Sequence, residues 1–347
     1  MNSSNKALSA AITWLRFPLI FMVIMLHGAS VVPVPGNHDV FYKVIYPLFL
    51  WLGETGVPGF LFISGYLFFF SRKGYREKLT NRYHSLFIPY ILWNGLLLVA
   101  YLVAYALGYP QDINGKNIAD FNVLDYFRLF WDRGTYNDGN FVPLLCPYWY
   151  IRNLLILSLL SPIVYFLVKY LRDFFLFAAA IWWMMTFHNA FIQQSILFFS
   201  LGAYFSIHQI DPLSLFVNYK SLFVSLFVIF GMADIITHTM LSTPVNLQIH
   251  RLALICNIPF FFLIANYYVS RHIQSPLLAR SAFIIFSIHY LIIVPMRKAC
   301  VGHFSDANDA IQVILYFGSI LTTTALCLLF FLVLPTKFRE LLSGNRS

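Results

Sequence analysis

Two ionisable residues stand in the first long apolar stretch of the chain, where burying such a side chain in a spanning helix costs free energy. Arg16 and His27 are eleven residues apart. Eleven helical steps of 100° return to within about 20° of the starting direction, and each step rises about 1.5 Å. We therefore expect both side chains on one helix face, about 16 Å apart along its axis.

The two side chains could do complementary chemistry. The permanently charged guanidinium of Arg16 suits phosphate or pyrophosphate, and the imidazole of His27 can take a proton from a hydroxyl near neutral pH. Purely structural roles are the alternatives for both residues. Arg16 could snorkel to the cytoplasmic interface, and His27 could be a hydrogen-bonded packing residue.

Other polar residues inside apolar runs are functional candidates for the same reason. Glu54 falls at a depth like that of His27 in the next, antiparallel helix, so it could orient His27 as a carboxylate does in a catalytic triad. The alternative is a pairing with some other buried donor. The remaining candidates for substrate or oxyanion contact, with structural pairing as their alternative, are Asn94, Arg152, Asn153 and His289. Asp234 and His238 complete the set.

The composition places these residues in lipid. The 347-residue chain is 59% hydrophobic and only 11% charged, whereas a soluble domain carries about 25% charged residues. Spanning helices need about 20 mostly apolar residues each, and lipid leaves no partner for free backbone groups, so the spans must be helical. The sequence predicts an all-α integral membrane bundle of about ten helices: 10–32, 45–70, 85–108, 148–168, 174–188, 191–207, 219–238, 250–269, 281–300 and 311–334.

Charges in the loops predict the orientation. The formal net charge of +9 lies in short loops between apolar runs, which indicates membrane topology and not a nucleic-acid partner. Because every second loop is the more basic one, both termini are expected in the cytoplasm. The segment 109–147 then faces outward. We expect one membrane-embedded domain over 1–347, with a short cytoplasmic tail at 335–347, in the plasma (inner) membrane.

Glycines gather in the second predicted span. Gly53, Gly56, Gly59 and Gly65 share that helix with Pro58. Small residues allow two helices to approach closely, and a proline removes a backbone hydrogen bond and kinks a helix. We predict close helix packing at the glycines, while a kink beside a cavity is the alternative.

Several segments, in this order, resemble the acyltransferase-3 family of membrane acyltransferases. The residues 15–18 (LRFP) followed by His27 are similar to its Arg-x10-His signature. The residues 57–66 (VPGFLFISGY) resemble its second-helix motif. Lys78, Arg82 and 86–94 (LFIPYILWN) resemble its basic loop and third helix. The residues 147–154 (PYWYIRNL), 198–204 (FFSLGAY) and 287–289 (SIH) resemble later blocks.

The resemblance implies a ten-helix enzyme that moves an acyl group, usually acetyl, from cytosolic acyl-CoA to a hydroxyl. The acceptor would be a cell-surface polysaccharide, lipid-linked glycan or other glycoside. By matching position, His27 would be the catalytic histidine, Arg16 its partner on the donor side, and Arg82 part of the donor-binding loop. Two positions depart from the family pattern, because Asn153 replaces an acidic residue and His84 replaces an arginine.

A mechanism follows as a hypothesis. CoA phosphates would rest on the basic segment 72–82, and His27 would act as a general base or carry the acyl group briefly. No metal is expected, because no set of residues has metal-ligand spacing. The expected partners are the bilayer and a glycan or glycolipid acceptor. The donor-binding residues would be Arg72, Lys73, Arg76, Lys78 and Arg82.

Two other functions fit part of the pattern. A transporter or flippase for a lipid-linked sugar would also have many spans, buried polar residues and interrupted helices, although no internal repeat links the two halves. A membrane sensor that kept the fold and lost the chemistry is the third interpretation. The presence of both Arg16 and His27 favours the enzyme over that sensor.

Overall fold

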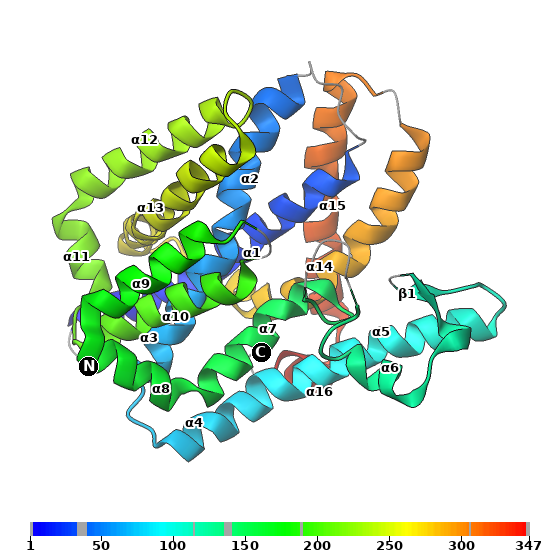
Figure 1. Cartoon of the computed structure of the whole chain (residues 1–347), viewed down its shortest axis with the longest axis horizontal. Helices are drawn as coiled ribbons and strands as arrows, with labels where there is room; N and C mark the ends of the chain where they lie inside the picture. The colour runs from blue at the N-terminus through cyan, green and yellow to red at the C-terminus, as the bar shows by residue number, and fades with distance from the viewer. Residues whose placement is uncertain are drawn as a thin grey trace. The chain divides into compact units, whose positions relative to one another are not determined.

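The computed structural model describes residues 3–32, 40–113, 115–134, 141–187, 190–304 and 307–344. Helices dominate these residues (Figure 1). Among them the sole sheet pairs β1 (Asp112–Ile113) with β2 (Lys116–Asn117) in antiparallel register. The chain forms two compact units. The first consists of Met1–Phe70 and Phe198–Val333, and the second consists of Ser71–Leu197 and Leu334–Ser347.

The described residues contain seven helical segments long and apolar enough to cross a membrane, or up to eight if a bent pair counts as one span. The protein is therefore a multi-pass, predominantly helical membrane protein. The difference from the predicted ten lies in 146–207, where a bent pair precedes the shorter apolar helix α10 (Phe191–Ile207). The seven segments are Lys6–Val31, Phe41–Phe70, Tyr75–Ala106, Lys220–Thr237, Thr243–Ser270, Pro276–His303 and Asp309–Val333.

The sequence placed the boundary between the fourth and fifth predicted spans near Lys169 and Arg172. The chain changes helix there, because a π-helical turn (Leu167–Leu171) ends and α9 (Arg172–Met185) begins at Arg172, whose backbone φ of 46° is not helical. A second break, which the sequence did not predict, lies earlier, where α7 (Trp149–Leu159) ends and the axis turns by 68°. Pro162 stands in the first turn after the break, where its missing N–H and its ring prevent the α7 hydrogen bonds from continuing.

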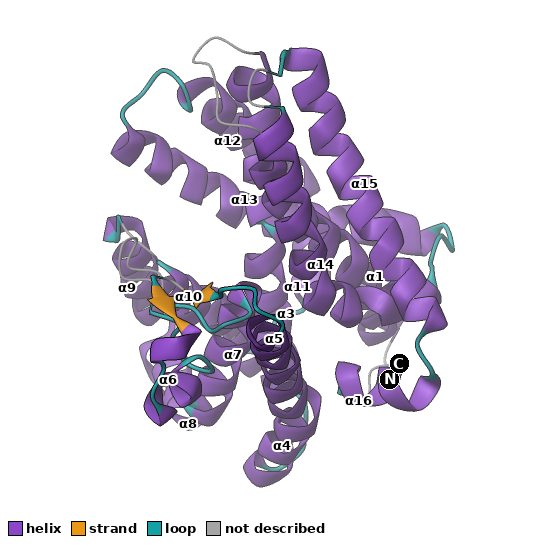
Figure 2. Cartoon of the chain, turned by 90° about the vertical axis from the view of Figure 1, so that its right-hand side faces the viewer, coloured by secondary structure: helices purple, strands orange, loops and turns teal. Residues whose placement is uncertain are grey.

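The first unit is built around α1 (Ser3–Gly28), whose buried side chains include Leu15, Leu19, Ile20 and Ile24. Helices packed against it bury these residues, and in Figure 2 the neighbouring α14 and α15 can be followed beside it. The helices in contact with α1 are α2 (Tyr46–Glu54), α3 (Gly56–Phe70), α11 (Pro212–Asn218), α13 (Thr243–Ser270), α14 (Pro276–His303) and α15 (Asp309–Val333).

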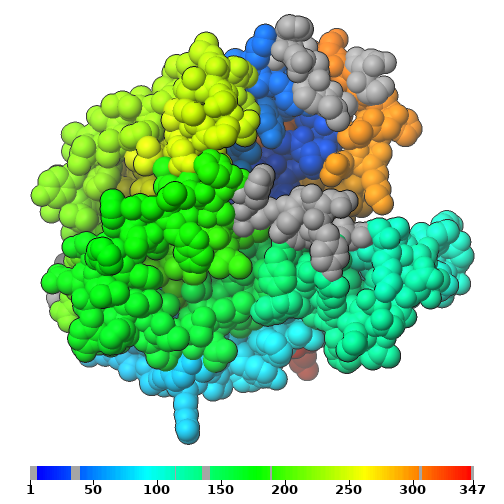
Figure 3. All heavy atoms as spheres, in the orientation of Figure 1, coloured from blue at the N-terminus to red at the C-terminus, as the bar shows by residue number. Residues whose placement is uncertain are grey.

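Helix α12 (Lys220–Thr237) lies at the surface of the first unit and packs on α13. Figure 3 shows both helices on one face of the molecule. The outward side chains of α12 are apolar, and Val228, Ile229, Met232 and Ile236 are each at least half exposed. A helix that is apolar on its exposed side suits contact with lipid tails and not with water.

The glycines of the second predicted span are at close helix contacts. A Cβ on Gly53 would lie 3.0 Å from the backbone nitrogen of Leu26, and one on Gly56 would lie 2.6 Å from the carbonyl oxygen of Leu19. Gly65 meets the backbone of Phe199 in α10 even more closely. The helix also breaks between Glu54 and Gly56, just before the position where Pro58 withholds its backbone N–H from the helix.

The second unit holds α4 (Tyr75–Arg82), α5 (Ile88–Ala106), α6 (Val123–Arg128), α7, α8 (Ser161–Phe166), α9 (Arg172–Met185) and α16 (Thr336–Ser343). The described part of the segment 109–147 packs Ile113, Ile118, Leu129 and Leu144 together against α5. Asn122 caps α6, and the Lys116 ammonium donates a hydrogen bond of 2.7 Å to Asp125. That hydrogen bond holds the pKa of Asp125 below its usual value.

Candidate active site

Arg16 and His27 both lie in α1, which is one helix from Ser3 to Gly28. Arg16 is exposed, whereas His27 is half-buried in the last turn. A continuous helix keeps the geometry expected from the sequence, with the two side chains on one face and about 16 Å apart along the axis. The α1 helix therefore separates a permanent positive charge from an imidazole by about three turns.

A second histidine stands beside His27. The ring centroids of His27 and His289, which belongs to α14, are 5.4 Å apart. Tyr290 places its ring edge-on to His27 at a centroid distance of 5.3 Å. Helix α14 packs along α1, and this contact brings together residues that are more than 260 positions apart in the sequence.

Hydrogen bonds fix the protonation pattern of His289. Its Nδ1 is 2.7 Å from the carbonyl oxygen of Phe286 and 3.2 Å from that of Ile285, so Nδ1 carries the hydrogen. In a neutral imidazole the other nitrogen is then an acceptor. His289 is fully buried, and its Nε2 has no hydrogen-bond partner among the described residues. In its neutral form His289 can therefore accept a hydrogen bond at Nε2 from a neighbouring donor.

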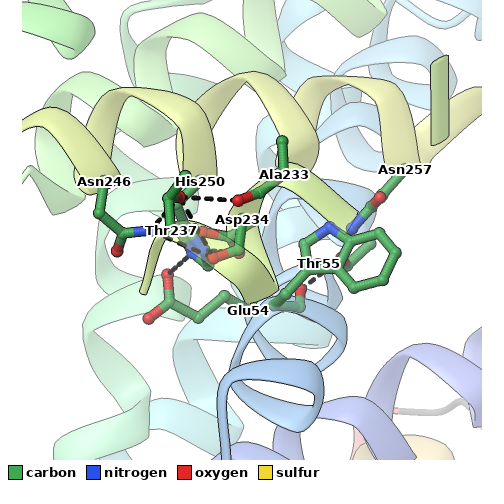
Figure 4. A network of polar contacts seen from close by, with 9 residues as sticks. Glu54, Thr55, Ala233, Asp234, Thr237, Asn246, His250 and Asn257 are labelled. Atoms are coloured by element: carbon green, nitrogen blue, oxygen red, sulfur yellow. Dashed lines mark hydrogen bonds and ion pairs between the residues drawn. The ribbon is translucent and has the colours of Figure 1, made fainter. Parts of the chain in front are cut away.

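Glu54 has a different partner from the one predicted. Its Oε2 lies 3.0 Å from Nε2 of His250 in α13, and Nδ1 of His250 lies 2.7 Å from Oδ2 of Asp234 in α12 (Figure 4). Asn246 supports the same network through a 3.2 Å hydrogen bond to Asp234. The alternative left open by the sequence, a pairing of Glu54 with another buried donor, is therefore the one observed.

His250 was not among the predicted site residues, because it falls at the very start of a predicted span, 250–269. Helix α13 begins at Thr243 instead, so His250 is nearly two turns inside it and is buried. The adjacent His250 and Arg251 at the edge of an apolar run were the available signal. The sequence around His250 shows two adjacent polar residues, but the acidic residues that pair with His250 belong to two other helices.

Arg152 binds two backbone carbonyl oxygens of the second unit. Its Nη1 donates to the carbonyl oxygen of Trp131 at 2.6 Å, and its Nη2 donates to that of Phe141 at 2.8 Å. The guanidinium carbon also lies 4.0 Å from the centre of the Phe141 ring. A buried cation is satisfied by such carbonyl and aromatic contacts, so Arg152 joins α7 to Trp131 and Phe141.

The two asparagines predicted near the site also have structural partners. Asn94 accepts from the backbone nitrogen of Leu145 and donates to the carbonyl oxygen of Tyr90, both at 2.9 Å. Asn153 donates to Oγ of Ser195 at 3.1 Å and receives a hydrogen bond from Arg152. These contacts tie α7 and α5 to neighbouring segments of the second unit.

Replacing Arg152 with lysine is expected to destabilise the protein. A lysine ammonium cannot reproduce the planar fork that meets two carbonyl oxygens and a ring face, and an unsatisfied buried carbonyl costs about 1–3 kcal/mol. We expect a lower melting temperature in detergent by intrinsic fluorescence. Arg128→Lys is the control, because Arg128 is half exposed in a surface ion pair with Asp132. Equal melting temperatures for both variants would show that the contacts of Arg152 with the two carbonyl oxygens do not stabilise the protein.

The basic segment belongs to the second unit. Arg72, Lys73 and Arg76 are exposed, while Lys78 and Arg82 are half-buried one helical turn apart on α4. Lys73 forms an exposed ion pair of 2.8 Å with Glu77. Surface cations in this arrangement can make charge-assisted hydrogen bonds to phosphate. No group of three or more potential metal ligands occurs within the described part of the chain.

The fold and the site define a class of protein: a multi-pass helical membrane protein with a histidine pair embedded among its spans. A family model described as an acyltransferase domain matches residues 9–332. The chain therefore belongs to the acyltransferase-3 family.

One curated relative extends the comparison. The chain is 29% identical over 225 residues to the succinoglycan biosynthesis protein ExoH of Rhizobium meliloti (strain 1021). That alignment covers 58% of this chain and 55% of the relative, so the chain spans about half the length of the curated protein it matches. A search of the solved structures gave no match.

Proposed function

We propose that the protein is an O-acyltransferase that moves an acyl group, acetyl in the first instance, from cytosolic acyl-CoA to a hydroxyl of a carbohydrate. The observation that carries the proposal is the pair His27 and His289 within the spans of a family member. The name of the relative, a succinoglycan biosynthesis protein, supports a polysaccharide or lipid-linked glycan as acceptor.

His27 is the proposed base. It removes the hydroxyl proton as the oxygen attacks the thioester carbonyl, a C–O bond forms, the C–S bond breaks, and the proton ends on the sulfur of free CoA. Transient acylation of His27, followed by transfer to the hydroxyl, gives the same products. The unpartnered Nε2 of His289 supports a role in accepting a hydrogen bond from the N–H of His27, as a carboxylate does in a triad.

The donor would be bound through its phosphates. The exposed cations Arg72, Lys73 and Arg76, with Lys78 and Arg82 on the next turns, support this role. A topology of ten spans in the plasma membrane with both termini in the cytoplasm would turn this segment toward cytosolic CoA. Arg16, exposed on α1, would meet the donor before it reaches His27.

The test is acyl transfer by the purified protein in detergent, with labelled acetyl-CoA or succinyl-CoA and a membrane glycan extract as acceptor. We expect a base-labile ester on the glycan and release of one CoA per ester formed. The donor with the higher kcat/KM identifies the acyl group. If neither donor releases CoA nor labels any extract, the enzyme is excluded and the transporter for a lipid-linked sugar becomes the better explanation.

A further inference from the structure

A buried ion network joins three helices of the first unit and is not used by the proposed chemistry. His250 of α13 lies between Asp234 of α12 and Glu54 of α2, with a carboxylate oxygen on each ring nitrogen (Figure 4). An ionised carboxylate can only accept hydrogen bonds. Both ring nitrogens must therefore donate, so His250 is an imidazolium when both acids are ionised.

The network is balanced in charge. Arg251, the next residue of α13, is also buried and interacts electrostatically with Glu54. Two positive and two negative groups then offset one another in charge, in a setting where an unpaired charge is strongly unfavourable. A further cation has no charge to neutralise here, and the pairing holds Glu54 as a fixed carboxylate.

Glu54 is more exposed than the two residues that hold it. Its side chain is 38% exposed, whereas those of His250 and Asp234 are 8% and 3% exposed. Oε2 of Glu54 contacts His250, while Oε1 has no hydrogen-bond partner among the residues that the structure describes. His250 thus holds Oε2 in place, and Oε1 is left to accept a hydrogen bond from a bound molecule.

Helix packing brings the backbone of Glu54 near the backbone of the proposed catalytic histidine. Gly53 precedes Glu54 and lies against Leu26, which precedes His27, because a Cβ on Gly53 would lie 3.0 Å from the Leu26 backbone nitrogen. The path from the Cα of Glu54 through Gly53 and Leu26 to the Cα of His27 is about 14 Å long, and this length is an upper limit on the distance between the two Cα atoms. One sugar ring with its substituents can reach across that distance.

We propose that Glu54 binds a second hydroxyl of the acceptor, one that is not acylated, and thereby selects a polyhydroxylated acceptor at the His27 site. Asp234 and His250 position the carboxylate. A hydroxyl fits because a carboxylate accepts O–H hydrogen bonds strongly and because the network already balances its own charge. This inference rests on the proposed acyltransferase function.

The substitution that tests it is Glu54→Gln. The amide carbonyl can still accept from His250, but the open oxygen becomes an NH2 group, which donates. Losing a charge-assisted hydrogen bond predicts a rise of about ten-fold or more in KM for the acceptor. KM for acetyl-CoA should change little, and kcat should fall by less than KM rises. The melting temperature should fall, because the substitution leaves the network with one positive charge in excess. The acceptor is the membrane glycan extract, quantified as hexose.

Controls separate binding from folding. Glu340→Gln removes a carboxylate from the exposed α16 and should leave both KM values unchanged. Asp234→Asn weakens the hydrogen bonding that positions Glu54 and should raise the acceptor KM less than Glu54→Gln does.

An unchanged acceptor KM in Glu54→Gln, with wild-type transfer intact, refutes this inference alone. A fall in melting temperature with an unchanged ratio of the two KM values shows that the network is purely structural. Absence of wild-type transfer refutes the proposed function instead.

Discussion

Replacing His27 with glutamine is expected to lower kcat for acyl transfer by about 10²–10⁴-fold, the contribution typical of a positioned general base. Glutamine keeps a polar side chain of similar size at the half-buried end of α1, but it has no basic nitrogen to receive the hydroxyl proton. The rate is measured as CoA release with a thiol reagent in parallel with labelled ester on the glycan. The variant should reach wild-type expression and melting temperature.

Two further histidine variants sharpen this prediction. His289→Gln removes the buried acceptor beside His27 and should reduce kcat by less than the loss of His27 does, because positioning is a smaller contribution than proton transfer. His303→Gln, at the exposed end of α14, should leave the rate unchanged. Full activity in the His27 variant would move the chemistry to another residue, with His289 as the first candidate.

Placing a methyl group on Gly65 or Gly202 is expected to destabilise the first unit strongly. A Cβ on Gly65 of α3 would collide with the backbone of Phe199, and a Cβ on Gly202 of α10 would collide with that of Phe62. Both obstacles are backbone atoms, which cannot rotate away as a side chain can. Overpacking of this kind costs about 1–3 kcal/mol and occasionally more. Gly65→Ala and Gly202→Ala should lower the yield of monodisperse protein and its melting temperature.

Gly318→Ala is the matched control. Gly318 lies in α15, and a Cβ there would have no heavy atom within 4 Å. Because alanine favours a helix over glycine by up to about 1 kcal/mol, the control should match or exceed the wild type in melting temperature. A similar loss in all three variants would show that the α3–α10 contact does not govern the effect.

The class of the protein and its first candidate pair could be predicted from the sequence, because both depend on local properties. Long apolar runs must become helices in lipid, and the eleven-residue spacing of Arg16 and His27 fixes their relation once one helix contains both. The glycines of the second span predicted close packing for the same reason, since a missing side chain allows backbone approach wherever a neighbour lies. The order of motifs predicted the family, which the match over residues 9–332 confirms.

The partners of the polar residues were decided by tertiary structure. Glu54, Asp234 and His250 meet because α2, α12 and α13 pack together, and no periodicity in one helix specifies which neighbour it touches. The same holds for His289 beside His27 and for Arg152 on the carbonyls of Trp131 and Phe141. A sequence shows that a buried polar group needs a partner, but the partner comes from a distant segment whose position only the packing of the helices sets.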